Sequence, residues 1–178
     1  MKRSKLPDLE AHKLEFKSLF ECETDRGLAL VGAAFLDDAV MELLRAFFVD
    51  DSKTVGEAFE TALSTFGNRC KIAYCLGLIG PDMFFDLNRI RKIRNDFAHA
   101  YSEIDFSTSR IKNQCLNLRI ATLADPSKTN SPRDCFISSV TLLAYYCLEK
   151  TTKIERQVPG KDYRTVSTCL PISFFPKD

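Results

Sequence analysis

The chain has 178 residues, of which 45% are hydrophobic and 28% are charged. This composition is typical of a globular protein that forms one domain with its own core, and it excludes a disordered chain. The net charge is +1, whereas proteins that bind duplex DNA non-specifically show a basic excess, so any basic surface must be local.

Apolar residues recur with helical spacing along most of the chain, beginning with a helix predicted over residues 8–22. A longer helix is predicted over 24–49, where Thr24 suits the N-cap position and small residues around Gly32 would let another helix approach closely. Three acidic residues interrupt its apolar centre, namely Asp37, Asp38 and Glu42. We interpret two of them as solvated and expect one to pair with a basic residue of a helix at 86–101, because charges among apolar neighbours need partners.

The helix over residues 86–101 has one apolar side and one basic side. The apolar stripe consists of Leu87, Ile90, Ile93 and Phe97, and basic residues fill much of the rest. Because the stripe must pack against other helices, this segment is not free to lie in a DNA groove. The sequence also contains no helix-turn-helix, zinc finger or basic zipper, so direct DNA binding is not expected.

Three shorter helices are predicted, over residues 53–64, 69–78 and 109–118. In the second of them, Arg69 and Lys71 are expected to face solvent. A last helix starts with Ser131 as its N-cap and Pro132 as its first residue, and its interior is apolar enough to be mostly buried.

The pattern changes at Val158, where Pro159 follows and breaks the helical periodicity. Residues 163–170 alternate weakly, as in a strand. We therefore divide the chain into a helical domain over residues 1–157 and an irregular C-terminal tail over 158–178. The apolar residues of the tail suggest that it docks on the domain or on a partner.

The seven cysteines form no C-x-x-C pair, and the chain has only two histidines. This is poor material for a zinc site, so neither a metal nor a cofactor is expected. We interpret the cysteines as reduced core residues of a cytoplasmic protein. No apolar run follows the charged N-terminus or reaches the length of a membrane span, so no membrane contact is expected.

The helix at 86–101 ends in Arg-Asn-Asp-Phe-Ala-His, running from Arg94 to His99. Asn95 and His99 are four residues apart and share one helix face. Arginine holds phosphate oxygens with a planar fork and histidine titrates near neutral pH, so these side chains could handle a phosphate group. The alternative interpretation is structural: His99 would satisfy carbonyl groups at the helix end, and Arg94 would be an ordinary solvated ion.

This R-N-x-x-x-H pattern resembles the signature of HEPN domains, which are helical and usually dimeric. Many members are metal-independent endoribonucleases, in which the Arg and His of two copies converge on the RNA phosphodiester and the 2′-hydroxyl attacks it. The resemblance implies that Arg94 stabilises the charged phosphorane, His99 moves protons and Asn95 orients them.

Three longer blocks resemble the mannitol operon repressor family. They are DRGLALVGAAFLDD at 25–38, STFGNRCKIAYCLGLI at 64–79 and DLNRIRKIRNDFAH at 86–99. The resemblance implies an all-α fold related to the HEPN fold, and a homodimer. From the helical patterns we expect a single helical-bundle domain of about five to seven helices. That family is named for repression of mannitol uptake genes, yet its members lack an obvious DNA-binding motif.

Two functions follow from these resemblances. The first is a transcriptional or metabolic regulator that acts through contacts with a protein partner. The alternative is a HEPN-type endoribonuclease, a toxin or defence effector, that uses Arg94 and His99 across a homodimer and takes RNA as its partner. The longer match favours the regulator, whereas the complete R-N-x-x-x-H pattern keeps the ribonuclease open.

Overall fold

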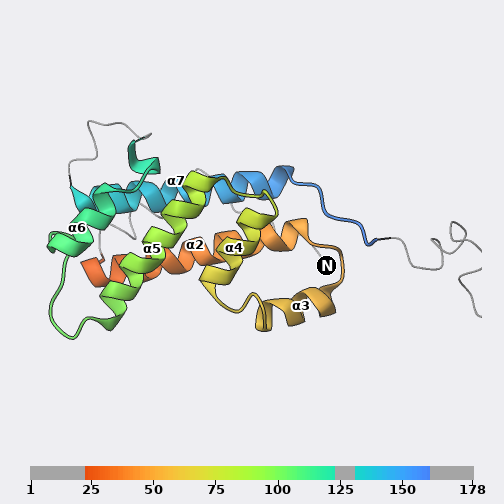
Figure 1. The fold of residues 1–178 in the computed structure, drawn as a ribbon, viewed down its shortest axis with the longest axis horizontal. Coiled ribbons are helices and arrows are strands. Elements are labelled where there is room, and N and C mark those ends of the chain that lie inside the picture. The colour runs from red at the N-terminus through yellow and green to blue at the C-terminus, as the bar shows by residue number, and fades with distance from the viewer. Residues whose placement is uncertain (1–22, 123–130, 161–178) are drawn as a thin grey trace, which may run out of the picture.

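The computed structural model describes residues 23–122 and 131–160, and this part of the chain is all-helical (Figure 1). Its elements are α2 (Asp25–Phe47), α3 (Ser52–Glu60), α4 (Phe66–Cys75), α5 (Pro81–His99), α6 (Ser109–Leu116), the 3-10 turn η1 (Ile120–Thr122) and α7 (Pro132–Lys153). The predicted all-α fold is confirmed. The helix predicted over 8–22 and the strand-like pattern at 163–170 lie outside the described residues, and the division of the chain at residue 157 stays a prediction.

The helix starts follow the expected chemistry. The side chain of Thr24 accepts a hydrogen bond from the backbone N–H of Gly27, and that of Ser131 accepts one from the N–H of Asp134, as helix N-caps do. Helix α4 begins earlier than residue 69, where it was predicted, because Thr65 caps it by accepting from the N–H of Asn68.

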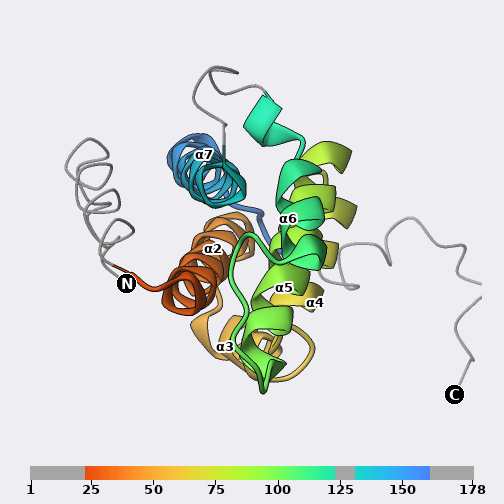
Figure 2. The same cartoon turned by 90° about the vertical axis from the view of Figure 1, so that its left-hand side faces the viewer.

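The helices form two layers, with α2 and α7 in one and α4, α5 and α6 in the other (Figure 2). Helices α2 and α7 run in the same direction, since Asp25 pairs with Arg133 near their first turns and the Gln157 N–H donates to the Phe47 carbonyl beyond their ends, at 2.8 Å. The predicted close approach at Gly32 is found, because a Cβ there would lie 3.1 Å from the ring of Phe136 in α7.

Helix α5 joins the two layers and contacts α2, α4, α6 and α7. Its predicted stripe is fully buried, and consists of Leu87, Ile90, Ile93 and Phe97. The ring of Phe97 lies 5.1 Å from that of Phe106, and Phe106 lies 5.2 Å from Phe136 in α7, so aromatic contacts cross the core from one layer to the other. The side of α5 that faces away from this core carries its polar residues, except Asp86, which is buried.

Two expectations about charged residues were wrong. Asp37 pairs with Arg69 of α4 and not with the α5 helix, through bonds of 2.6 Å from Nε and from Nη2 to its two carboxylate oxygens. Arg69 therefore points inward, and only Lys71 of the predicted outward pair is exposed. Asp38 and Glu42 are exposed, as expected for two of the three acidic residues in α2.

In the described part of the chain, none of the helices combines the length and the apolar character that a membrane crossing would need.

Candidate functional site

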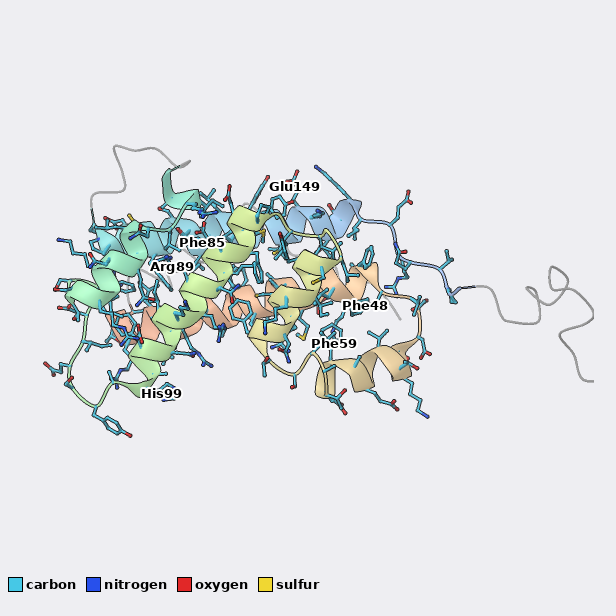
Figure 3. The ribbon with its side chains drawn as sticks, in the orientation of Figure 1. Phe48, Phe59, Phe85, Arg89, His99 and Glu149 are labelled. Atoms are coloured by element: carbon cyan, nitrogen blue, oxygen red, sulfur yellow. The ribbon has the colours of Figure 1, made fainter. Side chains whose placement is uncertain are left out.

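The predicted site residues lie at the C-terminal end of α5 (Figure 3). Arg94 is exposed and donates from Nη1 to the side-chain oxygen of Asn95, at 2.9 Å. His99 is the last residue of the helix and is also exposed. Within residues 23–122 and 131–160, no hydrogen bond joins the imidazole of His99 to Arg94 or Asn95. One copy of the chain therefore places the three side chains on the same helix end and connects only Arg94 with Asn95.

A further arginine, Arg26, reaches this end of α5 and was not foreseen from the sequence. Its Nη2 donates to the carbonyl of Ala100, the C-cap residue of α5, at 2.7 Å. Arg26 thus satisfies a carbonyl group at the end of α5, which is the role that the structural interpretation gave to His99. The two residues are far apart in the sequence, so no local signal could have paired them.

A hollow of about 550 Å³ opens beside this contact, between the start of α2 and the loop that follows α5. Its lining consists of Thr24, Asp25, Arg26, Tyr101, Ser102, Glu103, Ile104, Asp105 and Thr108. Tyr101 is wholly exposed at its edge. Because the lining mixes an exposed aromatic ring with acidic groups, the hollow presents a surface suited to a polar or protein ligand.

Hydrogen bonds fix the loop that forms one wall of the hollow. Asp105 accepts from the side chains and backbone N–H groups of Ser107 and Thr108, and these bonds lower the pKa of its carboxyl group. The N–H of Phe106 donates to Asp25 at 2.9 Å, and Asp25 also pairs with Arg133 of α7. The loop between α5 and α6 is therefore tied to α2 and, through Asp25, to α7 of the other layer.

At the other end of α5, a buried carboxylate holds the chain after α6. Asp86 is 1% exposed and accepts from the backbone N–H groups of Arg119 and Ile120, at 2.9 and 2.8 Å. Burial raises the pKa of Asp86, although the two hydrogen bonds act in the opposite direction. The guanidinium of Arg119, which pairs with Asp82, lies 4.0 Å from the ring centroid of Phe85.

The described residues offer no group of three or more His, Cys, Asp and Glu side chains placed to hold a metal ion. The cysteines in the described part of the chain are free thiols: Cys70, Cys75, Cys115, Cys135 and Cys147. All except Cys75 are buried, and burial raises the pKa of the Cys70, Cys115 and Cys147 thiols to about 12. These three thiols pack in the core and stay protonated at neutral pH.

The fold and the polar end of α5 define a two-layer helical domain with a surface hollow between α2 and the loop after α5. A family model described as "Mannitol repressor" matches residues 14–154, and the chain belongs to this family. The X-ray structure of the MtlR–HPr complex from Escherichia coli contains a chain of similar fold, with a TM-score of 0.61 and 20% sequence identity. The similarity covers 76% of this chain and 96% of that one. No curated protein matches the sequence.

Proposed function

We propose that this protein is a regulator that acts by binding another protein, and that its partner is an HPr-like protein. The observation that carries the proposal is the family match over residues 14–154 together with a structural neighbour solved in complex with HPr. Contact with a protein also agrees with a sequence that lacks a DNA-binding motif. Regulation would then depend on which protein partner is bound and would not require a helix that binds in a DNA groove.

The rim of the hollow is the surface that we assign to this partner. Tyr101 is fully exposed, and exposed tyrosines that become buried in a complex are among the residues that contribute most to binding. Glu103 adds an exposed carboxylate beside it. The rim is preorganised, because Asp25 and Asp105 hold the loop before any partner arrives.

Titration calorimetry with purified HPr tests the proposal. We expect binding at about micromolar or tighter affinity, and a loss of about tenfold or more for the double variant Tyr101→Ala/Glu103→Lys. Val158→Ala is the matched control, since Val158 is also strongly exposed but lies after α7, away from the hollow. If the unaltered protein did not bind HPr, the proposed partner would be wrong. If both variants lost the same amount of affinity, the assignment of the binding surface to the rim of the hollow would be wrong.

A second candidate function is a metal-independent endoribonuclease. The observation that favours it is that Arg94, Asn95 and His99 are all at one exposed helix end, with Arg26 bonded to the next residue. Two such ends brought together in a homodimer would provide cations for a phosphorane and an imidazole for proton transfer.

Incubation of the purified protein with single-stranded RNA in EDTA tests this candidate. Cleavage that leaves 2′,3′-cyclic phosphate ends and disappears in His99→Ala would support it. The exposed position of His99 means that this variant should fold normally, so circular dichroism provides the control. Intact RNA after incubation with micromolar protein would eliminate the ribonuclease.

A further inference from the structure

The layer formed by α4, α5 and α6 is basic, although the whole chain has a net charge of only +1. Helices α4 and α6 contain no acidic residue. The three acidic residues of α5 all have partners: Asp82 pairs with Arg119, Asp96 with Arg110 and Gln114, and Asp86 is buried against backbone N–H groups. No carboxylate of these helices is therefore left to neutralise their remaining cations.

Four cations of α4 and α5 have neither a hydrogen bond nor an ion pair with any residue in 23–122 or 131–160. They are Lys71 on α4 and Arg89, Arg91 and Lys92 on α5. Arg89 and Arg91 lie on opposite flanks of the solvent side of α5, since Arg89 contacts the ring of Phe85 and Arg91 lies against Gly67 of α4. Lys92 is between them on the helix surface.

The two arginines are held in place by packing. The Cζ of Arg89 is 4.6 Å from the ring centroid of Phe85, and a Cβ on Gly67 would be 3.5 Å from the Nε of Arg91. The Nε atoms of Arg89 and Arg91 are buried and have no hydrogen-bond partner in the described structure. A guanidinium that is fixed by its neighbours loses less conformational freedom when its remaining donors bind an anion.

Aromatic rings accompany these cations. Tyr74 and Phe84 stack across the α4–α5 contact, with centroids 4.8 Å apart and an interplanar angle of 15°. Tyr74 is 42% exposed, and Phe85 is partly exposed on the far flank of α5. Figure 3 shows Phe85 and Arg89 together on α5, towards the end opposite His99. Cations interleaved with accessible rings are the combination that binds phosphates and stacked bases of single strands.

We propose that this α4–α5 face, defined as Lys71, Tyr74, Phe85, Arg89, Arg91 and Lys92, binds single-stranded RNA. Lysine and arginine would contact successive phosphates, and the rings would stack with bases. A duplex fits less well, because α5 lies between α4 and α6 in its layer and cannot enter a groove as a free helix (Figure 1). The proposal does not depend on cleavage or on HPr binding, which involve the opposite end of α5 and the hollow beside it.

Fluorescence anisotropy with a labelled single-stranded RNA of about 12 nucleotides, in EDTA, tests the proposal. Four phosphate contacts predict a slope of log K against log salt of about −3, so the affinity should fall about 50-fold between about 50 and about 200 mM KCl. The triple variant Arg89→Gln/Arg91→Gln/Lys92→Gln should bind at least tenfold more weakly, with a slope of about −1.

A control with the same change in net charge is Arg45→Gln/Lys53→Gln/Arg156→Gln, because these exposed cations lie on α2, on α3 and after α7. It should retain the full affinity and slope, which would show that position and not total charge decides binding. Equal weakening in both triple variants would overturn the proposal. So would equally tight binding of duplex RNA, or displacement of the RNA by polyglutamate at equal charge, which would indicate a surface for acidic proteins.

Discussion

Substitution of Asp37 by alanine should destabilise the domain through the arginine that it leaves behind. Arg69 uses Nε and Nη2 to bind both oxygens of Asp37 and donates from Nη1 to the carbonyl of Leu63, with all three bonds at 2.6 Å. The side chain of Arg69 is 11% exposed and that of Asp37 is 25% exposed. In Asp37→Ala only the Leu63 carbonyl would remain as an acceptor, so the guanidinium would be largely buried without its counter-ion.

Removal of one partner of a fully buried pair costs about 3–5 kcal/mol, and the partial exposure of Asp37 favours the lower end of this range. We therefore expect the free energy of unfolding to fall by about 3 kcal/mol, which corresponds to a Tm lower by about 9 °C in a chain of this size. Urea unfolding followed by circular dichroism measures this difference.

Asp38→Ala is the control, because Asp38 is exposed and has no hydrogen bond or ion pair with any described residue. It should change the free energy of unfolding by less than about 0.5 kcal/mol. The double variant Asp37→Ala/Arg69→Met should recover most of the loss, since it no longer buries an unpaired charge. The reasoning would be refuted if Asp37→Ala were no less stable than Asp38→Ala, or if the double variant lost as much as the single one.

Two further predictions concern buried titratable groups. Because burial raises the pKa of Asp86 above 3.8, the unfolded chain releases this proton first as the pH rises. The free energy of unfolding of the protein relative to that of Asp86→Asn should therefore fall from about pH 4 up to the folded-state pKa and stay constant above it. Urea unfolding of both proteins at several pH values measures this difference, and a difference that does not vary with pH would contradict the prediction. Among the described cysteines, the exposed Cys75 should react with Ellman's reagent in the folded protein, whereas Cys70 should react only after unfolding. Mass spectrometry of the labelled peptides distinguishes the sites, and rapid labelling of Cys70 would be inconsistent with its burial.

The core side of α5 was predictable because each of its buried apolar residues follows from helical periodicity alone. Leu87 and Phe97 fall on the expected stripe and are fully buried. The partners of polar side chains were not predictable in the same way. Arg69 meets Asp37 and Arg26 meets Ala100 across 32 and 74 residues of sequence, so these contacts depend on how the helices pack.

The outward side of α4 shows the same limit. Ile72 and Leu76 are apolar, yet both are exposed, because the inward turn of Arg69 and the burial of Cys70 and Ala73 set the rotation of a short helix. The candidate site residues Arg94, Asn95 and His99 could be located on one helix end from spacing alone. Their surroundings, namely Arg26 and the hollow, required the three-dimensional fold.

The central claim is that this chain works by binding a protein partner at the rim of its hollow. Amide hydrogen exchange of the protein, measured with and without purified HPr, is the most direct test of this claim. We predict slower exchange on addition of HPr in residues 101–108 and in the first turn of α2, with unchanged exchange in α3. Unchanged exchange throughout these segments at saturating HPr, or protection confined to the α4–α5 face, would contradict the account.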